Sequence, residues 1–172
     1  MQNTSEKIIY GIHATPFGDI VVAITDKGLC WLGYMVKGYK GDGLTRMKEH
    51  FPSAEFVRDD NATKDMTSRI QKSWEQGKEK DIPLDLRGTD FQKSVWNALL
   101  EIPKGKVWSY GDLAVRIGRP KASRAVGTAV GENPVSLIVP CHRIVQKSGA
   151  IGNYGWGPDL KEKLLKAEGA IG

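Results

Sequence analysis

The spacing of apolar residues changes once along this chain of 172 residues, and the change limits what the chain can fold into. Short apolar runs separated by turn-forming residues predict β-strands near residues 8–10, 20–24 and 29–32. From residue 89 onward, apolar residues recur at helical spacing instead. A chain of this length can bury the core of one domain or of two small ones. We therefore predict a strand-containing N-terminal part and a mainly helical C-terminal part.

The junction between these parts is predicted from the segment 77–83, which is polar and ends in a proline. Two amphipathic stretches before it, at about 42–51 and 61–76, are predicted helices that cover one face of a short antiparallel sheet. We expect an N-terminal α/β domain over residues 1–86 and a C-terminal domain over residues 87–172.

Several classes of protein do not fit the composition. No apolar run approaches the roughly 18 residues of a membrane span, and residues 1–7 lack the features of a secretory signal, so we expect a cytoplasmic protein. The two cysteines, Cys30 and Cys141, are too far apart in sequence to suggest a disulfide framework or a metal knuckle. His13 and His50 have no partners at ligand spacing, so we predict no metal.

The second half of the chain reads as a series of helices. The first begins near Thr89 and ends before Pro103. Ser109 is a predicted N-cap, with Asp112 three residues later as a variant of the capping box. Another helix is expected at about 121–132, directly after a tight turn, and this order is typical of a helix-turn-helix. The last predicted helix covers about 158–168.

The net charge of +5 lies entirely in the second half, because residues 1–88 carry equal numbers of acidic and basic residues. A localised basic surface favours a polyanionic partner such as DNA. In the helix near 121–132, basic and polar side chains share one side, and small residues would allow close approach to a groove. The alternative is that the two helices only pack the core, as most short helical hairpins do. The candidate DNA-binding residues in this segment are Lys121, Ala122, Ser123, Arg124 and Thr128.

A thiol with two potential cations beside it follows an apolar run at 137–139. We predict that this run is a strand, interrupted by Pro140 and followed at once by Cys141-His142-Arg143. A thiol becomes a nucleophile as the thiolate, which neighbouring positive charge and a general base both favour. The alternative is a buried structural cysteine, which is common among apolar neighbours.

Two further observations bear on this cysteine. In a regular strand Cys141 and His142 would point to opposite faces, so either Pro140 bends the chain or a water bridges the two side chains. Glu168 lies in the last turn of a predicted helix, where the macrodipole disfavours a carboxylate by about 0.3–1 kcal/mol. Orienting a histidine would be one reason to keep it there, and free solvation is the other.

Polar and glycine residues lie in loop-like segments beside the cysteine. They either form turns only, or they line a pocket for a flat polar ligand. These residues are Asn133, Gly152, Asn153 and Tyr154, together with Tyr110.

Several motifs occur in a fixed order along residues 89–169. They cover residues 109–110, 121–127, 131–134, 140–143, 149–154 and 164–169. In this order they resemble the O6-alkylguanine-DNA alkyltransferase family. The resemblance implies a ribonuclease H-like N-terminal α/β domain and a helical domain whose helix-turn-helix enters the minor groove.

The resemblance also implies an activity. The chain would act as a monomer on double-stranded DNA and move the alkyl group of O6-alkylguanine, with O4-alkylthymine as a further candidate, onto Cys141. His142 would act as the base through a bridging water, Glu168 would orient His142, and Asn133 would complete the network. The thioether cannot be displaced again, so each molecule would act once, without a cofactor.

Recognition roles follow from the same resemblance. Arg124 would fill the gap left in the duplex when the damaged nucleotide is flipped out, because a thiolate cannot reach a stacked base. Tyr110 would turn the nucleotide and donate a hydrogen bond to the leaving guanine. The other residues of the guanine pocket would be Gly152, Asn153, Tyr154, Trp156 and Lys161.

The chain departs from the family pattern at positions near this pocket. Gly155 replaces a serine of some members, Ser136 stands where some relatives have proline, and Trp156 is bulky. These differences argue against large O6 substituents.

Other classes of function remain as alternatives. An alkyltransferase-like protein that only binds the lesion lacks the cysteine that is present here as Cys141. A Cys-His hydrolase would need an oxyanion hole, and it would leave the basic helix without a role. A transcriptional regulator fused to a repair domain would need a second DNA-binding pattern or a cysteine cluster in the N-terminal half.

Overall fold

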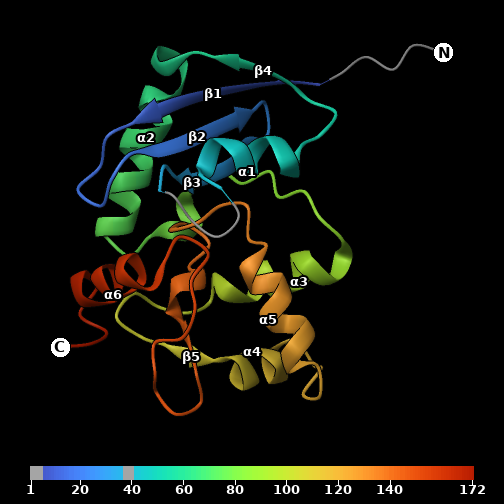
Figure 1. Cartoon of the computed structure of the whole chain (residues 1–172), viewed down its shortest axis with the longest axis vertical. Helices are drawn as coiled ribbons and strands as arrows, with labels where there is room; N and C mark the ends of the chain where they lie inside the picture. The colour runs from blue at the N-terminus through green and yellow to red at the C-terminus, as the bar shows by residue number, and fades with distance from the viewer. Residues whose placement is uncertain (1–5, 37–40) are drawn as a thin grey trace. The chain divides into compact units, whose positions relative to one another are not determined.

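The computed structural model describes residues 6–36 and 41–172. The chain divides into two compact units, Met1–Leu86 and Arg87–Gly172, which are described separately below (Figure 1). Within the described ranges, no helix is both long enough and apolar enough to cross a membrane.

The first unit is built on a four-stranded sheet with the order β3-β2-β1-β4. Strands β1 (Lys7–His13), β2 (Ile20–Thr25) and β3 (Gly28–Tyr34) form an antiparallel meander, as the sequence predicts. Strand β4 (Glu55–Arg58) was not predicted, and it pairs in parallel with β1. The prediction of a purely antiparallel sheet is therefore wrong. With four residues, mostly exposed, β4 is too short to give a periodic apolar pattern.

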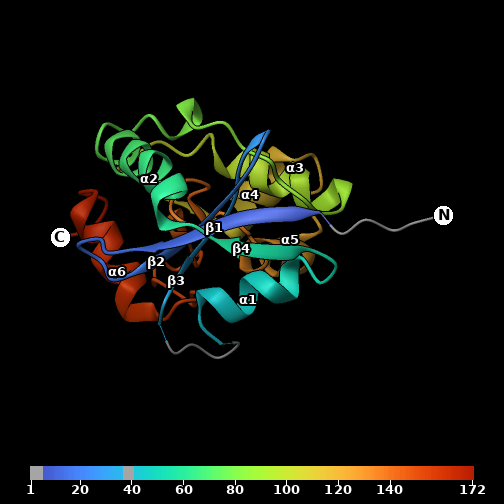
Figure 2. The same cartoon turned by 90° about the horizontal axis from the view of Figure 1, so that it is seen from above.

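Two helices and one 3-10 turn complete this unit. Helices α1 (Gly43–His50) and α2 (Asp60–Glu75) confirm the two amphipathic stretches. Helix α1 contacts β3, and α2 contacts β1 and β2. In the view of Figure 2, strands β1 and β4 run between the two helices, so the helices cover opposite faces of the sheet. The prediction that both cover one face is therefore wrong, because amphipathic spacing shows that a helix packs on a sheet but not on which face. The 3-10 turn η1 (Glu79–Asp81) lies in the polar segment that follows α2.

The second unit is mainly helical, and α5 packs against both α3 and α4 (Figure 1). Two short strands, β5 and β6, pair in parallel. The bounds are α3 Asp90–Leu99, β5 Trp108–Ser109, α4 Tyr110–Arg116, α5 Ser123–Gly131, the 3-10 turn η2 Cys141–Arg143, β6 Ile144–Val145 and α6 Pro158–Ala167.

Side-chain caps fix where α3 and α4 begin. Thr89 and Ser109 each accept a hydrogen bond from the third backbone N–H of their helix, and the side chain at that position bonds back to the cap. Gly118 adopts a φ of +75° just after α4, which suits a glycine that ends a helix. Between α3 and α5, the buried indole of Trp96 donates to the carbonyl of Ala129 at 2.9 Å.

The apolar run at 137–139 is not a strand. It forms a turn in which Leu137 has a φ of +72°, the left-handed region that most side chains avoid. The carbonyl of Val139 accepts hydrogen bonds from the backbone N–H of Cys141 and the side chain of Asn133, at 2.8 Å each. The strand prediction is wrong because short apolar runs do not distinguish strands from other buried segments.

Replacing Ser109 with alanine tests the capping of α4. The change removes the hydrogen bond from the N–H of Asp112 to the Ser109 hydroxyl, 3.0 Å long, and should lower the free energy of unfolding by about 1 kcal/mol. Urea denaturation gives this value. Ser94→Ala is the matched control, because Ser94 is exposed inside α3 and alanine is the better helix former there. Equal stability of the two variants would contradict the assignment.

Candidate active site

Cys141 is the first residue of η2 and is held from both sides of its backbone. It is 8% exposed. Before it, the buried side chain of Asn133 donates to the carbonyl of Val139 and accepts from the N–H of Val135 at 3.0 Å. After it, the N–H of Arg143 donates to the carbonyl of Pro140. The amide of Asn133 therefore fixes the turn that presents the thiol.

The 3-10 turn at Cys141 also sets the directions in which the side chains of Cys141 and His142 point. A 3-10 turn has about three residues per turn, so consecutive side chains point about 120° apart rather than to opposite faces. The expectation that Cys141 and His142 point to opposite faces assumed a strand, and it does not apply to η2.

A buried carboxylate joins the two residues that follow the cysteine. Oε2 of Glu168, at the C-terminal cap of α6, lies 2.9 Å from Nε2 of His142. The guanidinium of Arg143 donates to both oxygens of Glu168, through Nε at 3.0 Å and Nη2 at 2.8 Å. Its Nη1 donates to the carbonyl of Ile102 at 2.8 Å. All three ionisable side chains are buried.

The charge of this carboxylate follows from its partners. Burial by itself raises the pKa of Glu168, but the hydrogen bonds from His142 and Arg143, together with the charge of Arg143, outweigh it and lower the pKa to about 2. Glu168 is thus ionised at neutral pH and carries no proton. The proton between Glu168 and Nε2 of His142 belongs to the imidazole, and the other ring nitrogen, Nδ1, is also buried.

Tyr110 and Lys161 lie close enough to Cys141 to interact with a charge on its sulfur. Burial lowers the pKa of Lys161 to about 8, while a charge on Cys141 acts in the opposite direction. Burial raises the pKa of Tyr110, and a charge on Cys141 raises it further. Tyr110 is the first residue of α4, and its ring lies against Gly127 of α5. A Cβ atom at position 127 would lie 3.6 Å from the ring carbons of Tyr110. Two predicted site residues therefore lie near the thiol.

The loop at 152–157 leads into α6 and is bonded to Lys161 of that helix. The ammonium group of Lys161 donates to the carbonyl of Asn153 at 3.1 Å, whereas the side chain of Asn153 is exposed. Tyr154 and Trp156 are buried. The indole of Trp156 donates to the hydroxyl of Ser136 at 2.7 Å, inside the protein. Gly152 has a φ of +78°, which favours glycine at that position.

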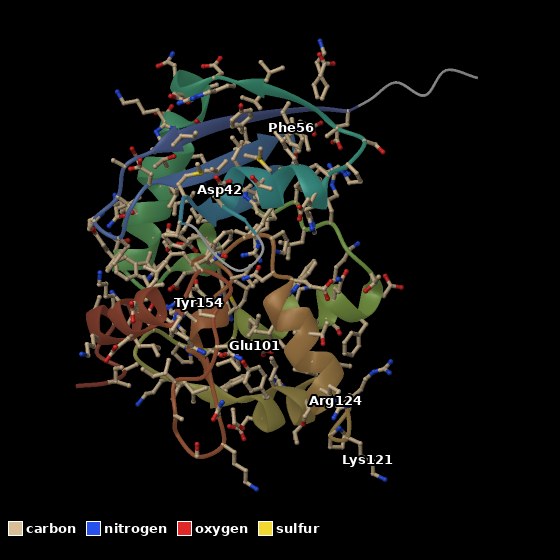
Figure 3. All side chains as sticks on the ribbon, viewed as in Figure 1. Asp42, Phe56, Glu101, Lys121, Arg124 and Tyr154 are labelled. Carbon is tan, nitrogen blue, oxygen red and sulfur yellow. The ribbon has the colours of Figure 1, made fainter. Side chains whose placement is uncertain are left out.

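The predicted DNA-binding residues lie just before α5 and along it. Lys121, Ser123, Arg124 and Thr128 are exposed, and Ala122 is half-buried. Helix α5 begins at Ser123, so Lys121 and Ala122 belong to the preceding turn rather than to the helix as predicted. Figure 3 shows the side chains of Lys121 and Arg124 pointing away from the ribbon.

A shallow open groove of about 680 Å³ lies between the first turn of α3 and one face of α5. Phe91 and Gln92 line it from α3, and Arg124, Ala125 and Thr128 line it from α5. The guanidinium of Arg119 lies over the ring of Phe91, 5.6 Å from its centre, which is a cation–π contact.

Two of the contacts in this site were not predicted. The link between Arg143 and Glu168 joins residues 25 positions apart, and the bond between Trp156 and Ser136 joins residues 20 positions apart. No local pattern indicates either of them. Among residues 6–36 and 41–172, no cluster of three or more His, Cys, Asp or Glu side chains could hold a metal ion.

Comparisons with known proteins place the chain in a family. A profile of the 6-O-methylguanine DNA methyltransferase DNA-binding domain matches residues 90–170. A methylated-DNA–protein-cysteine methyltransferase of Methanosarcina acetivorans is 42% identical, over 94% of this chain and 98% of its own. An inducible methylated-DNA–protein-cysteine methyltransferase of Bacillus subtilis is 40% identical, over 86% of this chain and 82% of its own.

A solved structure has a similar fold along almost the whole chain. The Mycobacterium tuberculosis OGT in complex with DNA superposes with a TM-score of 0.75 at 35% sequence identity, over 94% of this chain and 93% of its own. The fold and the sequence agree over 94% of this chain. The chain therefore belongs to the methylated-DNA–protein-cysteine methyltransferase family.

Proposed function

We propose that this protein repairs DNA by moving the alkyl group of O6-alkylguanine onto the Sγ atom of Cys141. Each molecule acts once and needs no cofactor. The observation that carries the proposal is the buried and ionised Glu168, which is bonded to His142 and Arg143, the two residues that follow Cys141. The other cysteine, Cys30, is fully buried inside β3 and is a poor acceptor.

The proton of the thiol leaves through His142. Because Glu168 accepts the proton on Nε2, Nδ1 is the basic nitrogen of a neutral imidazole. A water molecule between Nδ1 and the thiol carries the proton across. The charge of Arg143 balances that of Glu168, so the ring has no further anion that would favour its protonation.

The transfer itself is a displacement at the alkyl carbon. The thiolate forms the new C–S bond while the bond between carbon and O6 breaks, and the electron pair of that bond goes to the guanine. Tyr110 keeps its proton at neutral pH because its pKa is raised, so its hydroxyl can donate to the departing base. The ammonium group of Lys161 stabilises negative charge close to Cys141.

Recognition requires the damaged nucleotide to leave the stack. In the proposed complex, α4 and α5 act as a helix-turn-helix in the minor groove of double-stranded DNA. Arg124 enters the gap in the base stack, and Lys121, Ala122, Ser123 and Thr128 contact the DNA. The guanine pocket is formed by Tyr110, Gly152, Asn153, Tyr154, Trp156 and Lys161. The hydrogen bond between Trp156 and Ser136 holds the bulky indole in place, which favours small alkyl groups.

Intact mass after incubation with duplex DNA that contains O6-methylguanine tests the proposal. We expect a gain of about one methylene per chain, saturating at one equivalent and located at Cys141 by peptide mapping. Cys30→Ala should behave like the unchanged protein, and Cys141→Ala should gain nothing. Retained lesion binding without any mass change would contradict the proposal and indicate a recognition protein.

Replacing Arg124 with alanine tests its proposed place in the base stack. With saturating duplex DNA, the rate of transfer should fall by about tenfold or more, because Arg124 no longer stabilises the DNA with the damaged nucleotide flipped out. A tenfold fall corresponds to about 1.4 kcal/mol in the activation free energy. The matched control is Lys121→Ala, which removes one charge nearby and should weaken binding without slowing transfer at saturation. Unchanged transfer rates in Arg124→Ala would contradict this role.

A further inference from the structure

Leu137 is the central residue of a strained turn. The N–H of Ile138 donates to the carbonyl of Ser136 at 2.9 Å, and a hydrogen bond between residues two positions apart defines a γ-turn. The φ of +72° at Leu137 assigns the turn to the rarer of the two forms, which is strained for any residue with a side chain. Within residues 6–36 and 41–172, no other residue except glycine has a positive φ.

A second γ-turn lies between Leu137 and the end of the segment that carries the thiol. The N–H of Cys141 donates to the carbonyl of Val139 at 2.8 Å, and Pro140 between them has a φ of −82° and a ψ of 64°. These angles belong to the common form, which is not strained. Because only Ile138 and Val139 separate the two turns, a change of the backbone angles at Leu137 moves Cys141.

Two hydrogen bonds hold the strained turn in its conformation. The N–H of Val139 donates to the carbonyl of Val135 at 3.0 Å, which closes the backbone around the turn. The indole of Trp156 donates to the hydroxyl of Ser136 at 2.7 Å, and both side chains are buried. Ser136 is also the residue whose carbonyl closes the γ-turn at Leu137. A strained backbone angle persists only where the surrounding structure holds it in this way.

The indole of Trp156 comes from a segment that is anchored elsewhere. Trp156 lies two residues before α6, and Lys161 of that helix donates to the carbonyl of Asn153 at 3.1 Å. The bond to Ser136 therefore ties the strained turn to α6. The net contribution of one buried hydrogen bond is similar in size to the cost of a positive φ outside glycine. Loss of this bond is thus enough to let the turn relax.

We propose that Ser136 and Trp156 are positioning residues, whose hydrogen bond keeps the strained turn at Leu137 closed and so holds Sγ of Cys141 in line with the alkyl carbon. The inference rests on the proposed function, because it takes Cys141 as the acceptor. It goes beyond the effect of Trp156 on the size of the alkyl group, since the same bond acts on the nucleophile. A displacement depends steeply on the position of the attacking atom.

Ser136→Ala tests the inference, because it removes the acceptor of the indole and leaves every proposed residue of the guanine pocket in place. Two rates are measured by intact mass in a Cys30→Ala background, so that Cys141 is the cysteine that reacts. One is methyl transfer from saturating duplex DNA that contains O6-methylguanine. The other is alkylation by iodoacetamide without DNA. A free reagent approaches the sulfur from any open direction, whereas the methyl group of a bound guanine approaches from one.

The two rates should separate. Ser136→Ala should transfer the methyl group on the order of threefold to tenfold more slowly, and it should react with iodoacetamide at least as fast as the background protein. Trp156→Phe should show the same separation, and the double variant should be no slower than the slower single variant. Trp96→Phe is the matched control, because it removes another buried indole bond, to the carbonyl of Ala129, and should slow neither reaction.

The strain at Leu137 is measured with two variants that remove the same side chain. At a positive φ, Leu137→Gly should melt about 2–4 °C higher than Leu137→Ala, because glycine adopts that conformation without strain. At an ordinary backbone position the order is reversed, since glycine has the more flexible unfolded chain.

Three results would overturn the inference. If Ser136→Ala leaves transfer unchanged, or slows both reactions equally, the bond does not set the position of the sulfur. If Trp96→Phe slows transfer as much as Ser136→Ala, the effect belongs to the fold in general. If Leu137→Ala melts higher than Leu137→Gly, the turn is not strained. Failure of the proposed function would be recognised separately, because the Cys30→Ala protein itself would then gain no methyl group from DNA.

Discussion

The candidate active site depends on one buried carboxylate shared by two cationic or basic side chains. Glu168 sits at the C-terminal end of α6, where the helix dipole disfavours negative charge, and it is removed from solvent as well. Desolvating an isolated carboxylate costs several kcal/mol. The two-pronged contact with Arg143 and the hydrogen bond to His142 offset that cost. Removing Arg143 would take away the positive charge that balances Glu168, and removing His142 would take away one of its hydrogen bonds.

The same carboxylate sets the geometry around the thiol. Arg143 connects Glu168 to the carbonyl of Ile102, so η2 is tied to the segment that follows α3 and to the end of α6. On the other side of Cys141, Asn133 ties the turn at 137–139 to the end of α5. Cys141 lies between these two fixed points. A nucleophile held in this way needs little reorganisation before it meets an alkyl group.

Much of the fold could be predicted from the sequence because periodicity and caps act locally. The three-strand meander, the amphipathic helices and the capping box at Ser109 depend on residues a few positions apart. Strand β4 was missed because it is short and exposed, and the run before Pro140 was assigned to a strand because buried turns and buried strands share an apolar composition.

The site was predicted in a different way. The motif at Cys141 left a nucleophile and a structural cysteine open, and the resemblance to a family favoured the nucleophile. The position of Glu168 at a helix end indicated an unusual carboxylate. The role of Arg143 could not be predicted, since it arises from a contact across 25 residues that only the folded chain brings together. For the same reason, nothing in the sequence connected Trp156 with Ser136.

The central claim is that Glu168 fixes His142 as a neutral imidazole with its proton on Nε2. Two-dimensional proton–nitrogen NMR of the histidine rings at neutral pH reports this directly, and His142→Gln identifies the signals. The account predicts a protonated Nε2 and an unprotonated Nδ1 in the unreacted protein. A proton on Nδ1, either alone or together with one on Nε2, would contradict the account, because His142 could not then take the proton of Cys141.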